Sequence, residues 1–565
     1  MTQKNSNQTT GAEAVVRQLE GHGVRHVFGL CGDTSLPFYD ALYRLDHGIT
    51  HILSRDERHA GYMADAYARV TGRPGICEGP SGGGATYIAP GLIEANDSSV
   101  PILAITTDVA TTSAGRYPLT ELDQEALFRP LTKWNGVIPA ANMVPRMMRR
   151  AFREMCGGRP GAVHLGLPFD VQKAEVTDED THADPAFTAY PARPAAPDPG
   201  DVAQVLEILA GAKRPVIICG GGVVLAGGEA ALAGFADATG IPVATTVSGQ
   251  GSLSDFHPLA LGVVGSNGGH DATRAVIDAA DCVFFMGCRA GSVTTERWRS
   301  PPRASVIVHM DSDPSVIGAN YTPAAALVCD ARLGLLALQA GLADMPIADK
   351  GGRDVARDAV AAKWANFTAR ATSDEQPIRP ERVIASLQDV LPPDAVVCAD
   401  PGTPCPYFSA WYKWPNAGRH FITNRAHGAL GYAIGASIGA QIGRPNAKVI
   451  CATGDGSFGM SVGELETMVR LNLPITVIVF SNAVFGWIKA GQKSGFGARY
   501  FSVDFSRTDH AAVARAYGLA AWTVSDPREL VPVLKSAIAH DGPTLVDVIA
   551  QPLQEANAPV SEWVA

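Results

Sequence analysis

The chain has 565 residues, too many for one compact domain, and at roughly 100–200 residues per domain we expect three. Hydrophobic residues make up 46% and charged residues 18%, a composition that excludes an intrinsically disordered protein. The 46 Lys and Arg against 56 Asp and Glu give a net charge of −10, which argues against a nucleic-acid-binding protein.

Strand-like and helix-like segments alternate along the chain, which is typical of parallel α/β sheets. The first block reads as helices over 14–23 and 57–72 and strands over 24–30, 49–55 and 99–108. A second block has strands over 214–222, 241–249, 282–291 and 304–313. A third has strands over 395–400, 448–455, 475–482 and 543–550. We therefore expect an α/β protein in which three domains each contain an open parallel sheet flanked by helices.

Two stretches break this rhythm and mark domain boundaries. Residues from about 172 to 200 are rich in Pro, Ala and Asp without any period, which indicates a linker. A second boundary follows residue 342. The expected domains are 1–172, 198–343 and 376–553, followed by a C-terminal tail, 554–565.

The sequence contains no segment that reads as a membrane span. Its apolar runs, such as Ile475–Phe480, have the length of a strand and not the ~20 residues of a spanning helix. The first ten residues, MTQKNSNQTT, are polar and lack a signal core. Ten cysteines are scattered singly without a CxxC pair, so we expect reduced thiols in a cytoplasmic enzyme that does not act on membranes.

Several familiar motifs are incomplete. Gly220–Gly222 follows an apolar strand, but Leu225 stands where a dinucleotide fingerprint needs its third glycine. The run SGGGAT at 81–86 fails in the same way because of Tyr87. No G-x-S-x-G elbow or HExxH pair occurs, which gives little support to a serine hydrolase or a transition-metal enzyme. These glycines indicate tight turns and close backbone approach.

One motif in the third block points to chemistry. Asp455 follows the strand KVICAT within Gly454–Ser457, and Asn482 follows the next expected strand. Parallel neighbouring strands would place both side chains at the carboxyl edge of the sheet, where open α/β sheets bind ligands. A carboxylate and an amide oxygen suit Mg²⁺, which keeps phosphate oxygens among its ligands, and the Gly-Ser turn offers N–H groups to a phosphate. Together the residues predict a Mg²⁺–diphosphate site, whereas either piece alone is better explained as a Gly-Asp-Gly turn or an unrelated surface Asn.

The segment from Gly454 to Asn482 resembles the binding motif of thiamine-diphosphate-dependent enzymes. The rest of the chain resembles the acetohydroxyacid synthase and pyruvate decarboxylase group of that superfamily. The resemblance is carried by four further segments: VFGLCGDTSLPFYDAL at 27–42, SRDERHAGYMADAYARVTGRPG at 54–75, SGGGATYIAPGLIEANDSSVPILAIT at 81–106 and NRAHGALGYAIGASIGA at 424–440. It implies pyrimidine-binding, central and diphosphate-binding domains, in that order.

The resemblance also implies roles for residues around the cofactor. Glu57 would exchange a proton with the aminopyrimidine ring, a task for which a buried carboxyl of raised pKa is suited. The Gly428 carbonyl would receive the amino group of that ring, and Leu430 would support the bent cofactor from below. Asp455, Asn482 and the Val484 carbonyl would hold Mg²⁺. The diphosphate would meet Gly402, Thr403, Gly456 and Ser457.

The residues on the substrate side depart from the known subfamilies. Asp33 stands where decarboxylases of the group carry a catalytic Asp, but their paired histidines have no counterpart in 112–124, and Ile488 replaces their catalytic glutamate. In the synthases the corresponding loop reads Phe-Gln-Glu, whereas here it reads Leu119-Thr120-Glu121, with Thr120 in place of Gln. In a separate segment, Gly83 takes the place of the proline of their S-G-P-G. His427 is either an acid/base near the reacting carbon or a structural histidine.

We therefore expect a thiamine-diphosphate- and Mg²⁺-dependent carboligase that is acetolactate-synthase-like. It would cleave a 2-oxo acid, or a related C–C bond, and pass the acyl carbanion to an acceptor. The alternatives are a decarboxylase that does not ligate, a lyase acting on acyl-CoA or 2-hydroxyketone substrates, and a binding subunit without catalysis. The resemblance implies a homodimer, because Glu57 of one subunit meets the diphosphate site of another, and a homotetramer as a dimer of dimers.

Three features leave alternatives open. The central domain of related enzymes binds FAD or ADP, and Arg289 is either a nucleotide-phosphate contact or a surface arginine. The C-terminal tail is either a lid or an interface segment. Phe485, Trp487 and Gln492 are either substrate contacts or ordinary helix packing.

Overall fold

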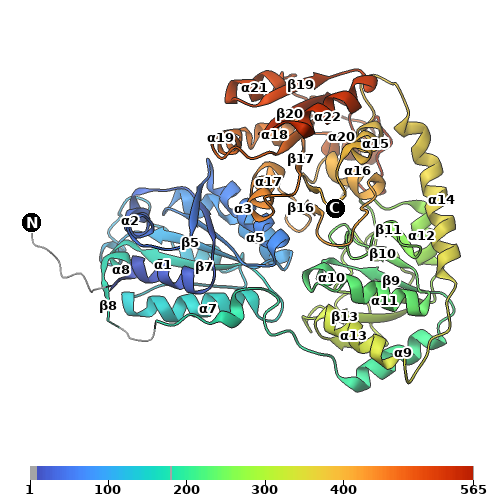
Figure 1. Ribbon diagram of the computed structural model, residues 1–565, viewed down its shortest axis with the longest axis horizontal. Coiled ribbons are helices and arrows are strands. Elements are labelled where there is room, and N and C mark those ends of the chain that lie inside the picture. Colours follow the sequence, from blue (N-terminus) through green and yellow to red (C-terminus); the bar gives the residue numbers. More distant parts are fainter. Residues whose placement is uncertain (1–8, 178–180, 564–565) are drawn as a thin grey trace, which may run out of the picture. The chain divides into compact units, whose positions relative to one another are not determined.

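The computed structural model describes residues 9–177 and 181–563 and shows two compact units. The first contains the chain up to Arg193 together with 426–429 and 435–445, and the second contains 194–425, 430–434 and the chain from Asn446 onward. In the described residues, three six-stranded parallel sheets are flanked by helices, one sheet in the first unit and two in the second (Figure 1). The expected three-domain α/β fold is therefore confirmed.

The sheet of the first unit has the strand order β3-β2-β4-β5-β7-β6. Helices α3 and α5 pack on one of its faces, and α1, α2, α7 and α8 form the layer on the other face (Figure 1). Its strands are β2 (His26–Gly29), β3 (Thr50–Leu53), β4 (Gly75–Gly79), β5 (Ile102–Asp108), β6 (Trp134–Val137) and β7 (Val163–Pro168). Its helices are α1 (Gly11–Gly21), α2 (Leu36–Arg44), α3 (Glu57–Thr71), α4 (Gly83–Tyr87), α5 (Ala89–Asp97), α6 (Gln124–Phe128), α7 (Val144–Cys156) and α8 (Phe169–Lys173).

The first sheet of the second unit, which we call the central sheet, has the order β11-β10-β9-β12-β13-β14. Its strands are β9 (Pro215–Cys219), β10 (Val243–Thr245), β11 (Ala260–Val263), β12 (Cys282–Met286), β13 (Val306–Asp311) and β14 (Ala325–Val328). Its helices are α9 (Pro199–Gly211), α10 (Gly221–Leu225), α11 (Glu229–Thr239), α12 (Asp271–Asp278) and α13 (Ala331–Gly341). Apolar cores lie on both faces, as the continuous apolar strands require.

The last sheet, the C-terminal sheet, has the order β16-β15-β17-β18-β20-β19. Its strands are β15 (Val396–Ala399), β16 (Phe421–Thr423), β17 (Val449–Gly454), β18 (Thr476–Ser481), β19 (Ala520–Val524) and β20 (Thr544–Ile549). Its helices are α15 (Pro380–Val390), α16 (Pro404–Trp411), α17 (Tyr432–Gly443), α18 (Asp455–Gly459), α19 (Leu465–Arg470), α20 (Gly486–Gly495), α21 (His510–Tyr517) and α22 (Leu530–Ala539). Helix α17 begins in the second unit and continues in the first.

The structure differs from the sequence-based expectation at both boundaries. Within the expected linker, β8 (Glu175–Val176) pairs antiparallel with β1 (Thr9–Thr10), and the side chains of Phe187 and Tyr190 are buried. Residues after 342, expected to be a plain boundary, lead into the 20-residue helix α14 (Gly352–Ala371). The pairing of β8 with β1 depends on residues far apart in the chain, which local composition does not reveal.

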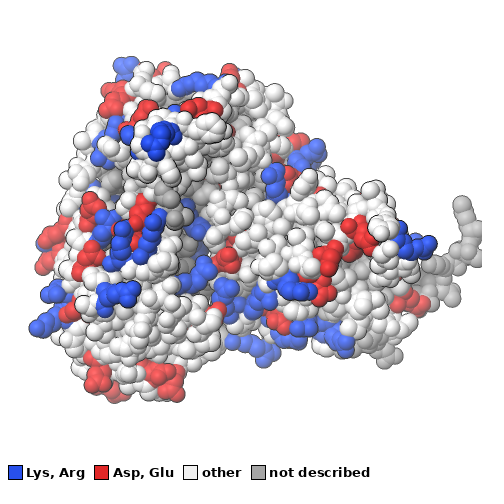
Figure 2. All heavy atoms as spheres, turned by 180° about the vertical axis from the view of Figure 1, so that it is seen from behind, with Lys and Arg blue, Asp and Glu red and all other residues white. Residues whose placement is uncertain are grey.

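The described residues agree with a protein that keeps its cysteines as thiols. All ten cysteines are free, and nine of them are buried. None of the helices in 9–177 and 181–563 combines the length and apolarity needed to cross a bilayer. Acidic and basic side chains are interspersed over much of the surface drawn in Figure 2.

Candidate functional site

Each sheet has a switch point, where the chain first extends the sheet in one direction and then in the other. In the C-terminal sheet this point lies between β15 and β17, which are parallel neighbours with Ala399 opposite Ala452. Loops that follow such strands diverge and leave a crevice at the carboxyl edge of the sheet. Asp400 follows β15 and Asp455 follows β17, so two carboxylates begin the loops at this edge.

Asp455 and Asn482 lie side by side at the ends of β17 and β18. Oδ2 of Asp455 accepts the backbone N–H groups of Asn482 and Ala483 at 2.7 and 2.5 Å, and Oδ1 accepts that of Gly456 at 2.9 Å. The side-chain Oδ1 of Asn482 is buried and has no hydrogen-bond partner among the described residues. A buried amide oxygen without a donor is costly unless a cation or water takes it. The donor set therefore fits Mg²⁺.

The backbone after Asn482 turns sharply. Ala483 has φ 58°, a left-handed conformation, and the chain then forms a bridge between Val484 and Asp504. The bridge uses the Ala483 carbonyl and the N–H of Phe485, and neither bond involves the Val484 carbonyl. In the described part of the chain, no group of three or more His, Cys, Asp and Glu side chains is arranged to hold a metal.

The residues predicted to meet a diphosphate surround the same edge. Helix α18 begins at Asp455, and a β-carbon at Gly456 would lie 2.7 Å from Cε1 of Phe485, so any other residue there would have to displace that ring. Ser457 is buried in the same helix. Thr403 precedes α16 and is buried, and a β-carbon at Gly402 would lie 3.9 Å from Cδ2 of Leu430.

Asp400 lies at the same edge of the sheet and is not among the residues predicted from the sequence. Its Oδ1 accepts the N–H groups of Tyr432 and Ala433 at the start of α17, at 2.9 and 3.3 Å. Its Oδ2 accepts the hydroxyl of Thr453 at 2.6 Å. Burial raises the pKa of Asp400 to about 6. An Asp placed directly after an apolar strand was the available signal, the same signal that identified Asp455.

Glu57 is the first residue of α3 in the first unit and is 7% exposed. Two glycines leave room for it: a β-carbon at Gly79 would lie 3.3 Å from its Cγ, and one at Gly84 would lie 3.0 Å from its Oε1. Burial raises the pKa of Glu57, and the nearby carboxyls of Asp56 and Glu78 act in the same direction. The group can therefore hold a proton at a higher pH than an exposed glutamate.

A chain of hydroxyl groups joins the other predicted residues of the first unit. Oγ1 of Thr34 lies 2.8 Å from Oγ1 of Thr107 and 3.1 Å from Oγ of Ser81. The Oγ of Ser81 in turn lies 2.7 Å from Oγ1 of Thr120. Asp33 is exposed next to Thr34 and accepts its N–H at 2.8 Å. The loops carrying Asp33 and Thr120 thus both meet the glycine loop that follows β4.

Thr120 adopts an unusual backbone conformation. Its φ is 71°, in the left-handed region that β-branched residues rarely adopt. A β-carbon at Gly82 would lie 2.9 Å from its Cβ, so Gly82 allows this close approach. The neighbouring Leu119 is 86% exposed and Tyr117 is 96% exposed.

His427 and Gly428 lie in an exposed segment that is assigned to the first unit. The backbone N–H of His427 is accepted by Glu94 at 2.8 Å, and Gly428 has φ 73°. Leu430 belongs to the second unit.

The switch point of the central sheet lies between β9 and β12. A β-carbon at Gly220 would lie 2.1 Å from the Gly287 carbonyl oxygen, and one at Gly222 would lie 2.7 Å from the Gly287 Cα. These glycines therefore pack backbone against backbone, as a structural turn. Arg289 is exposed, and its carbonyl accepts the side-chain N–H of Asn320 at 3.0 Å.

The C-terminal tail packs within the second unit. Arg297 and Arg299 pair with Glu562, and the Trp563 ring lies 5.1 Å from that of Trp487 in α20. Gln492, also in α20, bonds to the backbone of Phe501 through both ends of its amide. Trp487 and Gln492 therefore contact the protein itself, while Ile488 is 54% exposed.

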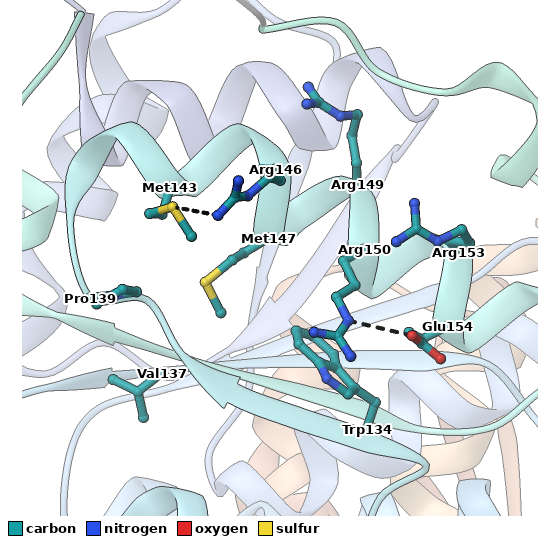
Figure 3. Close-up of a pocket in the computed structure, with 10 residues that line it drawn as sticks. All are labelled: Trp134, Val137, Pro139, Met143, Arg146, Met147, Arg149, Arg150, Arg153 and Glu154. Carbon is teal, nitrogen blue, oxygen red and sulfur yellow. Dashed lines mark hydrogen bonds and ion pairs between the residues drawn. The ribbon is translucent and has the colours of Figure 1, made fainter. Parts of the chain in front are cut away.

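A groove on β6 and α7 is separate from these residues (Figure 3). It has a volume of about 760 Å³, and the guanidinium of Arg150 lies over the Trp134 ring at 4.6 Å and 3.4 Å from Glu154. None of the site residues predicted from the sequence lines it.

Comparisons with known proteins identify the family of this chain. Three family models match: "Thiamine pyrophosphate enzyme, N-terminal TPP binding domain" over 9–127, the central domain of the same enzymes over 202–338, and their C-terminal TPP binding domain over 402–548. A probable acetolactate synthase large subunit of Methanococcus aeolicus is 34% identical over 557 residues, covering 96% of this chain and 92% of that protein. The acetolactate synthase isozyme 2 large subunit of Escherichia coli is 33% identical over 554 residues, covering 96% of each.

Proposed function

The chain belongs to the thiamine pyrophosphate (thiamine diphosphate) enzymes and is acetolactate-synthase-like, and on that premise we propose that it is a Mg²⁺-dependent carboligase acting on a 2-oxo acid. The observation that carries the proposal is the unpartnered, buried amide oxygen of Asn482 beside Asp455. Asp455, Asn482 and the Val484 carbonyl would hold Mg²⁺. Gly402, Thr403, Gly456 and Ser457 would hold the diphosphate.

Glu57 would manage the proton on the aminopyrimidine ring. Its carboxyl is buried between Gly79 and Gly84, and burial raises its pKa, so it holds a proton to a higher pH than an exposed glutamate does. The bound cofactor supplies the carbon that attacks the donor carbonyl and accepts the electron pair released when the C–C bond breaks. The Gly428 carbonyl would accept the ring's amino group, and Leu430 would support the ring.

The hydroxyl chain of the first unit is our candidate for substrate recognition. Ser81 and Thr120 offer hydroxyl groups to the carboxylate of a 2-oxo acid, and Thr34 orients Ser81 at 3.1 Å. Asp33 and His427 are the candidate proton donors and acceptors for the substrate. Both are exposed, so a substrate can reach them.

We also propose that the enzyme is cytoplasmic and works as a homodimer or homotetramer on small molecules. The ten free thiols support a reducing compartment. The relatives named above are described as large subunits, so a search for a smaller partner subunit of this chain is a useful experiment. Mg²⁺ and thiamine diphosphate are the proposed cofactors, and FAD or ADP in the central domain stays a prediction of the resemblance.

The decisive experiment follows ¹³C-labelled pyruvate by NMR with the purified protein, Mg²⁺ and thiamine diphosphate. We expect acetolactate, the product of ligation to a second pyruvate. Acetaldehyde alone would replace the carboligase by a decarboxylase that does not ligate. No conversion while the cofactor binds would exclude pyruvate as donor and direct the test to larger 2-oxo acids, 2-hydroxyketones and acyl-CoA compounds.

A further inference from the structure

Glu94 in α5 is a fully buried carboxylate that neither the motifs nor the comparisons single out. Its Oε1 accepts an N–H of Arg69 at 3.1 Å and the hydroxyl of Ser98 at 2.7 Å. Arg69 also pairs with Asp65 at 2.9 and 3.1 Å, so two buried carboxylates meet one guanidinium. A second buried carboxylate in such a group needs further donors to be stable.

Those donors come from a distant part of the chain. Oε2 of Glu94 accepts the backbone N–H of Ala426 at 3.1 Å and that of His427 at 2.8 Å, and all of these residues belong to the first unit. Burial raises the pKa of Glu94, whereas Arg69 and the His427 amide favour its ionised form. In that form the bonds to the consecutive amides are charge-assisted and stronger than neutral ones. Residues 424–429 form neither helix nor strand, so no regular backbone ladder fixes them.

Helix α5 is itself held firmly against α3. A β-carbon at Gly91 would lie 2.6 Å from the Gly61 Cα, and one at Gly61 would lie 3.0 Å from the Gly91 Cα. Glu94 stands one helical turn beyond Gly91, and Asp65 stands one turn beyond Gly61. The carboxylate that receives the two amides is therefore mounted on a tightly packed helix pair and not on a mobile loop.

We propose that Glu94 is a positioning residue that fixes the backbone of Ala426 and His427 and thereby presents the Gly428 carbonyl to the aminopyrimidine ring. This inference rests on the proposed function, which assigns the ring to Gly428. Glu94 does not touch the cofactor in this proposal. It determines how well the segment is ordered before the cofactor arrives, and so it acts on the binding of the ring and not on the binding of the diphosphate.

The test compares Glu94→Gln with two controls in the full-length protein. Gln keeps the size of the side chain, but its one oxygen cannot serve both Arg69 and the two amides. Ser98→Ala removes one bond to Oε1 and leaves Oε2 unchanged, and Asp65→Asn removes a charge from the same buried group at Arg69. Glu94→Asp is the second variant, because it keeps the charge while its shorter side chain cannot reach both amides, and it is used if Glu94→Gln does not fold.

The first readout is amide hydrogen exchange of the peptide covering 424–430, measured without cofactor. We expect exchange at residues 426 and 427 to become at least about tenfold faster in Glu94→Gln than in the wild type, while both controls exchange at the wild-type rate. Unchanged exchange in a folded Glu94→Gln variant would overturn the proposal.

The second readout is the dissociation constant of two ligands in the presence of Mg²⁺: thiamine diphosphate and inorganic pyrophosphate. We expect Glu94→Gln to raise the dissociation constant of thiamine diphosphate about tenfold, the effect of losing a charge-assisted bond. The dissociation constant of pyrophosphate should stay unchanged. Equal weakening of both ligands would overturn the positioning role. A wild-type protein that binds pyrophosphate but gains nothing from the thiamine part would instead overturn the proposed function on which this inference rests.

Discussion

The sheet of the first unit and the C-terminal sheet have the same strand order. In each sheet the second strand in the chain lies on one side of the first strand and the third strand lies on its other side, while the last strand in the chain, β7 or β20, lies between the two strands that precede it. The switch points therefore fall between β2 and β4 and between β15 and β17. The groups at the two crevices differ. The first carries the hydroxyl groups of Thr34, Ser81 and Thr120 and the buried carboxyl of Glu57, which lies near the buried Glu78. The second carries carboxylates and an amide oxygen, from Asp400, Asp455 and Asn482.

The difference shows that the fold provides the crevice and the side chains decide what it does. Burial raises the pKa of both Glu57 and Asp455. Asp455, however, accepts three backbone N–H groups, which favour the ionised form that a metal needs. Glu57 lies beside glycine backbone in a buried pocket, which suits a group that must gain and lose a proton. In the proposed function, the first crevice therefore serves proton exchange and the second holds charge.

The largest effect should come from Glu57→Gln, because this substitution removes the group proposed to exchange the proton and changes little else. Gln keeps the volume that Gly79 and Gly84 leave for the side chain but cannot exchange a proton. We expect turnover to fall by about 10²–10⁴-fold, the usual contribution of a general acid or base. Steady-state kinetics alongside a cofactor titration measures this, and cofactor affinity should change little. Near-normal turnover would remove Glu57 from the proton path.

Much of this comparison could be predicted from the sequence. The expected strands in 448–455 and 475–482 place Asp455 beside Asn482, because a polar residue that ends an apolar strand is a local pattern. Asp400 gives the same local signal but was missed, since nothing nearby shows that it accepts the amides of Tyr432 and Ala433. Glu94 gave no local signal, because its partners lie 332 and 333 residues away.

Asp400→Asn tests the charge-holding crevice through pH. Burial raises the pKa of Asp400 to about 6 from 3.8, so the folded protein binds this proton more tightly than the unfolded chain does. The contribution of Asp400 to the free energy of unfolding is therefore fully present below about pH 4 and is lost as the pH rises through about 6. Asn does not titrate. Between pH 4 and pH 7.5 the free energy of unfolding of the variant should therefore rise by up to about 3 kcal/mol relative to that of the wild type. Urea unfolding at both pH values measures the gain, and a pH-independent difference would contradict it.

Asp455→Ala tests the same crevice through its ligand. Removing the carboxylate deletes a proposed Mg²⁺ ligand and frees the N–H groups of Asn482 and Ala483. We expect the dissociation constant of Mg²⁺–thiamine diphosphate to rise by about 10–100-fold. Asp526→Ala is the matched control, because Asp526 caps a turn in the same domain through the Arg528 N–H. If both variants bound the cofactor like the wild type, the metal assignment would be withdrawn.

The smallest effect should come from Thr120, which separates the hydroxyl from the backbone strain. Thr120→Gly relieves the left-handed conformation at φ 71°, worth about 1 kcal/mol, but removes the hydroxyl that lies 2.7 Å from Ser81. Thr120→Ser keeps the hydroxyl. If this hydroxyl recognises the 2-oxo acid, Thr120→Gly should be as stable as the wild type but have a KM for the donor that is raised about five- to tenfold, the effect of losing one hydrogen bond. Thr120→Ser should keep the wild-type KM. Equal KM values for the two variants would mean that the crevice of the first unit serves proton exchange only and that the donor is recognised elsewhere.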